Sequence, residues 1–421
     1  MVEIWLPYGK TEVPVRIPDE NLLGVIEPKE KSGIQDPKSE IQRALANPIG
    51  SKPLHEIAKP GDKVAIVVDD ATRPAPSHIM MPPILDELRK IGVKDEDITI
   101  IFACGNHRPV KPEEIPRLIG DEIAKCIKTL SHDCKATDLV NVGTTSFGTP
   151  VYLNPSFVEA NVRILTGDIE LHYYAGYGGG RKSVLPGIAG SISIQKNHAL
   201  LLHPNARTGV LDGNPVHQDM TEAIKFARVD FVLNTVMNAK KEIVTAFAGD
   251  VEKAFLEGVK LVDDMYKVQV DKQADIVITA ADGSPHDIDL YQAHKAVDSV
   301  LDIVKQGGVI ILVAECREGY GNQIFYDWMT MFKTKQEMEK EIKRHFMLGG
   351  HKAYYLTKTL EKAKVILVST MPDYYATGVF RLKTAKTVNN ALQVAFNMVG
   401  KKSKVWVVPH GSITLPILTG E

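Results

Sequence analysis

The segment KVAIVVDDATRPAPSHIMMPPILDELRKIGVKDEDITIIFACGNH, residues 63–107, carries the pattern that decides the fold. Within it, KVAIVVDD (63–70) is an apolar run that ends in two acidic residues, which predicts a buried strand. Apolar residues at helical spacing follow in 78–92, and DITIIFACGNH (97–107) predicts a second strand that runs into a loop. A strand, a helix and a strand in this order are typical of a mostly parallel sheet.

The same alternation continues on the C-terminal side of this segment. Further strands are predicted at 162–170 and 231–238, and a second alternating block of strands and helices begins near Ala274. The sequence therefore predicts an α/β fold of two α/β domains with mostly parallel sheets and an active site in the cleft between them.

The expected boundary between the two domains follows from where the second block begins. We expect an N-terminal, cofactor-binding domain over residues 1–267, completed by the last helix and strand in 391–421. Residues 268–390 are expected to form the smaller C-terminal domain.

Composition narrows the class of protein. A chain of 421 residues, 44% hydrophobic and 24% charged, can bury the cores of two domains, and a net charge of −2 gives no global attraction to nucleic acid or anionic membranes. Its apolar runs have the length of strands, and MVEIWLPYGK lacks the regions of a signal peptide. The four cysteines form no C-x-x-C pair. We expect a cytoplasmic protein whose partner is a small molecule, without nucleic-acid or membrane partners.

The densest signal for a site is GDIELHYYAGYGGGRKSVLPGIAG, residues 167–190. Glycines let a backbone bend closely around a ligand, and successive amide groups bind anions. The stretch GGGRKS (178–183) is similar to the end of the nucleoside-triphosphate motif G-x-x-x-x-G-K-[ST], but that motif requires glycine where Arg181 stands. A cofactor loop is therefore favoured over a nucleotide loop or a purely structural glycine turn.

Polar motifs follow three of the predicted strands. They are DDATRP (69–74), CGNHRP (104–109) and the stretch from Gly167 to His172. Ligands of open parallel sheets bind beyond the C-terminal ends of the strands, so these motifs are expected to share one site. Histidine exchanges protons near neutral pH, and an arginine guanidinium binds a carboxylate with two hydrogen bonds.

Together with QKNH (195–198) and DIDLYQAHKAVDS (287–299), these motifs resemble the lactate racemase family, whose cofactor is a nickel pincer built on a pyridinium mononucleotide. The matching motifs are spread over most of the chain. The resemblance implies a nickel-dependent isomerase that interconverts the D and L forms of a 2-hydroxy acid, with lactate as the expected substrate.

The resemblance also implies a role for each matching residue. Lys182 would carry the cofactor, a pyridinium-3-thioamide-5-thiocarboxylate mononucleotide, through a thioamide. His198 would complete a square plane around nickel whose other donors are sulfur, carbon and sulfur of the cofactor. The other residues expected to bind or support the cofactor are Asp70, Thr72, Gly178, Gly179, Gly180 and Arg181.

His107 and His172 match the paired acid and base of the family, one for each side of the substrate. One histidine would take the hydroxyl proton while the α-hydrogen leaves as hydride to the pyridinium carbon. The planar 2-keto acid would then receive hydride on its other face. The residues expected to bind the substrate are Arg73, Lys295, Gln292 and Tyr291.

Several alternatives stay open at this point. The same machinery could serve malate, a longer-chain acid or a sugar acid, with pocket walls from Tyr354, Tyr355 or 371–380. A carrier that binds the nickel nucleotide without catalysis would need Lys182 and His198 but not the paired histidines. An ATP-dependent ligase or kinase would need a magnesium-binding carboxylate and glycine in place of Arg181. Enzymes that build the cofactor are expected as transient partners.

Overall fold

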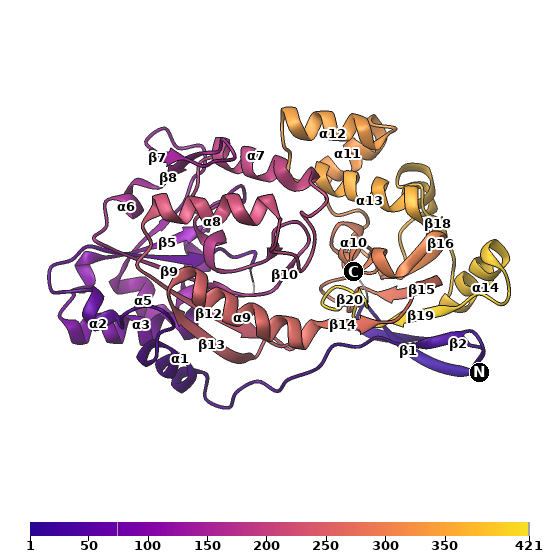
Figure 1. Cartoon of the computed structure of the whole chain (residues 1–421), viewed down its shortest axis with the longest axis horizontal. Coiled ribbons are helices and arrows are strands. Elements are labelled where there is room, and N and C mark those ends of the chain that lie inside the picture. The colour runs from indigo at the N-terminus through magenta and orange to yellow at the C-terminus, as the bar shows by residue number, and fades with distance from the viewer. Residues whose placement is uncertain (74, 420–421) are drawn as a thin grey trace. The chain divides into compact units, whose positions relative to one another are not determined.

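The structure is a computed structural model that describes residues 1–73 and 75–419. Pro74, the last residue of the DDATRP motif, lies outside the described residues. The chain divides into two compact units, and most of their elements are labelled in Figure 1. The central unit is Glu30–Asp264, and the terminal unit combines Met1–Lys29 with Met265–Glu421.

The central unit is built on a six-stranded sheet that is parallel except for its edge strand β13. In spatial order, the strands are β13 (Ile243–Gly249), β12 (Phe231–Met237), β9 (Val162–Asp168), β4 (Val64–Asp69), β5 (Ile98–Ala103) and β6 (Lys128–Ser131). Besides this sheet, the unit holds two antiparallel strand pairs. They are β7 (Val140–Thr144) with β8 (Pro150–Leu153), and β10 (Leu171–His172) with β11 (Gly176–Tyr177). Strands covered on both faces need apolar residues at successive positions, which explains the run VAIVV in β4.

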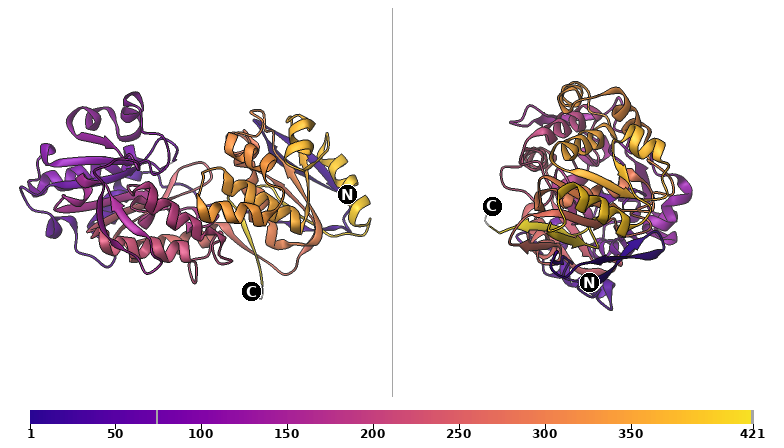
Figure 2. Two further views of the ribbon diagram at one scale, coloured as in Figure 1. Left: turned by 90° about the horizontal axis from the view of Figure 1, so that it is seen from above. Right: turned by 90° about the vertical axis from the view of Figure 1, so that its right-hand side faces the viewer.

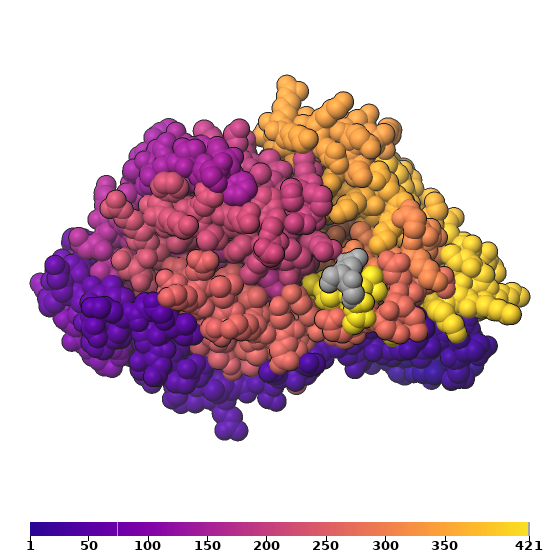
Figure 3. Space-filling model, in the orientation of Figure 1, coloured from indigo at the N-terminus to yellow at the C-terminus, as the bar shows by residue number. Residues whose placement is uncertain are grey.

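Helices lie on both faces of this sheet (Figures 1 and 2). The helices are α1 (Pro37–Ala46), α2 (Leu54–Ile57), α3 (Ser77–Ile91), α4 (Ile115–Ile119), α5 (Asp121–Cys126), α6 (Pro155–Val158), α7 (Ser191–Ala199), α8 (Pro215–Ala227) and α9 (Val251–Tyr266). Val64, Ile66 and Val68 of β4 pack into one core with α1 and α3. In the space-filling view, α8 and α9 form much of the surface of the central unit that faces the viewer (Figure 3).

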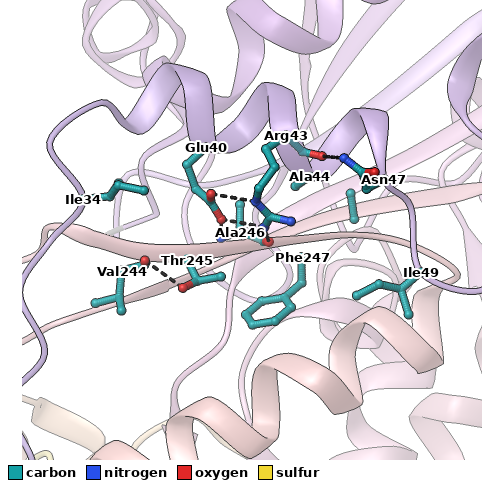
Figure 4. Close-up of a pocket in the computed structure, with 11 residues that line it drawn as sticks. Ile34, Glu40, Arg43, Ala44, Asn47, Ile49, Val244, Thr245, Ala246 and Phe247 are labelled. Carbon is teal, nitrogen blue, oxygen red and sulfur yellow. Dashed lines mark hydrogen bonds and ion pairs between the residues drawn. The ribbon is translucent and has the colours of Figure 1, made fainter.

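The edge of the sheet at β13 is closed by an ion pair of α1. Glu40 accepts a hydrogen bond of 2.8 Å from the amide of Ala246, and Arg43 donates one of 2.8 Å to the carbonyl of the same residue. Glu40 and Arg43 also bind each other at 2.6 Å, beside a cavity of about 450 Å³ (Figure 4). Side chains thus satisfy backbone groups that an edge strand otherwise exposes.

The terminal unit holds a second six-stranded sheet, in which every pairing is parallel. In spatial order, the strands are β18 (Lys383–Thr384), β17 (Lys364–Val368), β16 (Val304–Val313), β15 (Ala274–Ala280), β19 (Val405–Val408) and β3 (Leu22–Val25). The remaining strands form the pairs β1 (Val2–Tyr8) with β2 (Thr11–Ile17) and β14 (Lys267–Val270) with β20 (Leu415–Leu418). The helices are α10 (Leu290–Ser299), α11 (Gln323–Met331), α12 (Lys335–Arg344), α13 (Gly350–Lys362) and α14 (Val388–Val399). The structure confirms the predicted α/β class with two domains and mostly parallel sheets.

Both ends of the chain belong to a different unit from the one expected from the sequence. Residues 391–421 do not complete the 1–267 domain, because β19 pairs with β15 of the terminal unit. Residues 1–29 also belong to the terminal unit, since β3 pairs with β19 and the amide of Ile26 donates to the carbonyl of Val407. Pairing between strands so far apart in the chain leaves no local pattern in the sequence.

No helix within residues 1–73 and 75–419 is long and apolar enough to cross a membrane.

Candidate active site

Three polar motifs meet at one edge of the central sheet. The strands β4, β5 and β9 are parallel neighbours, so their C-terminal ends lie at the same edge. Asp70 follows β4, His107 follows β5 by a short loop, and His172 belongs to the hairpin that follows β9. The sheet thus gathers residues that are far apart in the sequence.

His107 is held by Asp70. Its Nδ1 lies 2.7 Å from Oδ2 of Asp70 and 3.1 Å from the hydroxyl of Thr72. Thr72 itself donates to Oδ1 of Asp70 from its amide at 2.7 Å and from its hydroxyl at 2.5 Å. Burial raises the pKa of Asp70, but the hydrogen bonds from His107 and Thr72 outweigh it and hold that pKa below its usual value. Asp70 is therefore ionised at neutral pH, and the geometry gives Asp70 and Thr72 the task of orienting His107.

His172 has the opposite hydrogen-bonding arrangement to His107, because its Nδ1 accepts a hydrogen bond. The amide of Ala175 donates to its Nδ1 at 3.3 Å, so in the neutral ring the hydrogen is on Nε2. Tyr173 stacks on the ring at 4.9 Å between centroids, and Tyr174 meets it edge-on at 4.5 Å. The same ring atom therefore has opposite roles in the two neutral histidines, because Nε2 accepts on His107 and donates on His172.

The glycine loop owes its shape to close packing. Gly179 and Gly180 have φ of 74° and 54°, a region that favours glycine. A Cβ at Gly179 would lie 2.8 Å from the carbonyl oxygen of Asp168. The amide of Gly180 donates to Oδ1 of Asn234 in β12 at 3.0 Å. These glycines, with Gly178, let the loop lie against β9 and β12; their contact with a cofactor stays a prediction.

Arg181 points into the protein. Its guanidinium lies 4.2 Å from the ring centre of Phe255, and it donates to four carbonyl oxygens of the loop, those of Ala175, Tyr177, Gly178 and Gly179. Burial lowers the pKa of Arg181 to about 9. These contacts fasten the loop, and the cofactor contact predicted for Arg181 stays a prediction.

Lys182 has the properties of a nucleophilic amine. Burial is the largest cause that lowers the pKa of Lys182, and the charges of Arg73 and Arg181 add to it. The carboxylates of Glu170 and Asp69 raise this pKa by less, so it lies well below its usual value. A lowered pKa leaves more of the amine neutral at physiological pH, and only the neutral amine attacks a carbonyl or thiocarboxyl carbon.

The carboxylates of Glu170, Asp69 and Asp168, which the sequence analysis did not name as site residues, act electrostatically on Arg73. Burial raises the pKa of Asp69 to about 6 and that of Asp168 well above its usual value. Burial lowers the pKa of Arg73, but the carboxylates of Glu170, Asp69 and Asp70 raise it by more. Asp69 and Asp168 are the last residues of β4 and β9, and both lie in motifs that the sequence analysis expected to share one site because they follow strand ends.

His198 lies on α7 and is buried. Burial, then the positive charges of Lys182 and His107, lower its pKa to about 3, so the three residues share one neighbourhood and the ring is neutral. Its Nδ1 lies 3.1 Å from Oδ1 of Asn197. A neutral imidazole with one nitrogen anchored to the protein suits a metal ligand.

Tyr291, Gln292 and Lys295 lie on α10 of the terminal unit. Asp289 caps this helix by accepting from the amide of Gln292 at 2.7 Å, while Lys295 is exposed. Their contacts with a substrate stay predictions. Sequence reasoning did not name Lys352 of α13. Burial and the charge of Lys295 lower the pKa of Lys352 to about 7.

Within the described ranges 1–73 and 75–419, no group of three or more His, Cys, Asp or Glu side chains is placed to hold a metal ion. The cavity beside β13 contains none of the predicted site residues. The residues that fit a nickel cofactor are therefore Lys182 and His198, an amine for attachment and one imidazole ligand.

Comparisons with known proteins agree over nearly the whole chain. Residues 8–209 match the lactate racemase N-terminal domain, and residues 269–415 match the lactate racemase C-terminal domain. The chain is 37% identical to a lactate racemase of Thermoanaerobacterium thermosaccharolyticum, covering 98% of both chains. It is 34% identical to one of Lactiplantibacillus plantarum, covering 98% of this chain and 99% of the relative.

Solved structures extend this likeness to the fold. The lactate racemase apoprotein of T. thermosaccharolyticum superposes with a TM-score of 0.92 at 36% identity, over 99% of this chain and all of that one. A Thermotoga maritima protein superposes with a TM-score of 0.66 at 20% identity, over 91% of this chain and 98% of the other, and shares the fold. The chain belongs to the lactate racemase family of isomerases.

Proposed function

We propose that this protein interconverts D- and L-lactate with a nickel-pincer nucleotide attached to Lys182. The observation that carries the proposal is the shared neighbourhood of Lys182, His198 and His107, in which an amine of lowered pKa and an anchored neutral imidazole lie beside an oriented histidine. When bound, the cofactor would accept the α-hydrogen of the substrate as hydride at its pyridinium carbon and return it to the 2-keto acid.

Lys182 and His198 would hold this cofactor. The amine of Lys182 would form the thioamide, and Nε2 of His198 would be the single protein ligand of nickel. Soft sulfur donors with one imidazole suit square-planar nickel. The glycine loop would contribute indirectly, because Arg181 fixes the path of the backbone that ends at Lys182.

The two histidines are proposed to move the hydroxyl proton. The Asp70 carboxylate keeps the hydrogen of His107 on Nδ1, so that Nε2 can accept a proton, and the resulting imidazolium is stabilised by the same carboxylate. His172, with its hydrogen on Nε2, is the matching donor. In one direction a neutral His107 would accept the hydroxyl proton while a protonated His172 donates one from Nε2, and in the other direction the two roles exchange.

Arg73, Tyr291, Gln292 and Lys295 are proposed to bind the substrate. The carboxylates of Glu170 and Asp69 keep the guanidinium of Arg73 charged, and a charged guanidinium binds a substrate carboxylate strongly. Another 2-hydroxy acid, such as malate, a longer-chain acid or a sugar acid, is the alternative substrate. A nickel-nucleotide carrier is less well supported, since it has no use for the pairing of His107 with Asp70.

The test is to produce the protein with and without the enzymes that build the cofactor, which are proposed as transient partners. The co-produced protein should carry one added cofactor mass on Lys182, bind one nickel and racemise lactate; protein made alone should do none of these. Lys182→Arg is the matched control, because it keeps a long basic side chain but cannot form the thioamide. An unmodified Lys182 in fully active enzyme would overturn the attachment, and activity on another 2-hydroxy acid alone would change the substrate.

A further inference from the structure

The hydrogen bond between His198 and Asn197 determines which ring nitrogen of His198 carries the hydrogen. Nδ1 of His198 lies 3.1 Å from Oδ1 of Asn197. An amide oxygen accepts hydrogen bonds and never donates them, so Nδ1 must donate. In the neutral ring this leaves the lone pair on Nε2.

The orientation of the Asn197 amide is itself fixed. Its Nδ2 donates to Oδ2 of Asp219 at 2.9 Å and to the carbonyl oxygen of Val216 at 3.2 Å. Turning the amide over would place its oxygen against these two acceptors and its nitrogen against Nδ1 of His198. The amide oxygen therefore has to face His198.

Asp219 in turn is tied to a different part of the central unit. It is fully buried on α8 and accepts hydrogen bonds from the hydroxyls of Thr145 at 2.5 Å and Thr149 at 2.9 Å. Both threonines belong to the turn between β7 and β8. A chain of hydrogen bonds thus runs from this turn through α8 and Asn197 to His198.

We propose that Asn197 and Asp219 are positioning residues that hold His198 in the tautomer and orientation in which Nε2 binds nickel. The inference rests on the proposed role of His198 as the ligand. Such anchors of metal-binding histidines typically contribute about 10- to 100-fold to metal affinity. Here the anchor matters more than in a site with several protein ligands, because the proposed site has a single one.

A purely structural role for Asp219 would be to fasten the β7–β8 turn to α8. The chain offers a matched control for this role, since Glu222 on α8 binds the same turn. Its carboxylate accepts from the amide of Ser146 at 2.7 Å and from the hydroxyl of Ser146 at 2.6 Å. Glu222→Gln therefore loosens the turn while leaving the Asp219–Asn197–His198 chain in place.

The first measurement uses apoprotein labelled with nitrogen-15 in its histidines, so it is independent of cofactor loading. The signals of His198 are identified by their loss in His198→Gln. We expect the Nδ1-protonated tautomer in the wild type and in Glu222→Gln, and a mixture of tautomers in Asn197→Leu. An Nε2-protonated His198 in the wild type overturns the proposal, and this outcome requires no variant to fold.

The second measurement is the rate at which cofactor-loaded protein loses nickel to EDTA. Asn197→Leu should release nickel about 10- to 100-fold faster, whereas Glu222→Gln should release it at the wild-type rate. Equal acceleration in both variants, or in neither, overturns the positioning role. Nickel release unchanged in His198→Ala instead removes His198 from the metal and contradicts the proposed function itself, so the two failures are distinguishable.

Discussion

Asp70 and His107 form a carboxylate–imidazole pair, with 2.7 Å between Oδ2 of Asp70 and Nδ1 of His107. The two residues come from loops after β4 and β5, and the register that sets Asp69 beside Ala103 brings those loops together. The pair fixes one tautomer of His107 before any substrate binds. A base held in this way loses little orientational entropy during the reaction.

Replacing Asp70 by asparagine should therefore slow racemisation. Asparagine keeps the size, but its amide nitrogen must face either His107 or Thr72, both of which donate to Asp70. We expect kcat to fall by about 10²-fold, within the usual range for general acid–base catalysis, while cofactor content stays unchanged. Thr72→Ser, which keeps the hydroxyl, is the control. Wild-type kcat in Asp70→Asn would show that the pair has no catalytic role.

The glycine loop allows a test of packing against ligand contact. Gly179→Ala should destabilise the protein, because its φ of 74° disfavours alanine and the new methyl would lie 2.8 Å from a carbonyl oxygen. Gly178→Ala should be tolerated, since its methyl would meet the flexible side chain of Glu170 at 3.1 Å. We expect a loss of about 1–3 kcal/mol for Gly179→Ala in urea unfolding of the apoprotein. Equal stability of the two variants would contradict the packing explanation.

The buried carboxyl of Asp69 predicts a pH dependence of stability. Its pKa in the folded protein, about 6, lies above the usual 3.8, so the folded state binds the proton more tightly than the unfolded state. Stability should therefore increase as pH falls from above 6 towards 4, as far as this group is concerned. Asp69→Asn should raise the melting temperature of the apoprotein at pH 8 and have less effect at pH 5. An equal effect at both pH values would show that Asp69 is ionised throughout.

The sequence predicted the parts of the fold that have local causes. The apolar run of β4 and the helical spacing of 78–92 were sufficient, even though α3 contains Pro82 and Pro83. The pairing of β3 with β19 was not predictable, because it joins Leu22 to Val405 and depends on which sheet has an open edge. Domain membership of both chain ends followed from that pairing.

The candidate site shows the same difference between features with local causes and features that depend on distant parts of the chain. Motif resemblance named Lys182 and His198, and the sheet places them in one neighbourhood with His107. The inward turn of Arg181 was not predictable, since GGGRKS does not say which neighbour faces the protein interior. Asp219 was missed because its hydrogen bonds reach Thr145, Thr149 and Asn197, and no spacing in the sequence links them.

The proposed two-sided arrangement of His107 and His172 predicts a difference between half-reactions. His107→Ala and His172→Ala should both abolish racemisation, because each full cycle needs one histidine to take a proton and the other to give one. Each variant should still oxidise the one enantiomer whose hydroxyl faces the remaining histidine. Single-turnover rates for D- and L-lactate should then differ by about 10²- to 10⁴-fold, with opposite preference in the two variants. The same preference in both would contradict the two-sided arrangement.

Lactate deuterated at the α-carbon tests how hydrogen leaves the substrate. If it leaves as hydride and returns from the same cofactor, the reaction should be slower than with ordinary lactate, and the deuterium should stay largely with the product. Hydride held on carbon does not exchange with water, whereas a proton on His107 or His172 does, since imidazole exchanges its protons rapidly with solvent when exposed. His107 retains 28% side-chain exposure, so a deuteron passed to it would be lost to water. Mass spectrometry of the product at partial conversion measures the retained label. Complete loss of deuterium in every turnover would show that a histidine abstracts the α-hydrogen as a proton, and the proposed hydride transfer would have to be abandoned.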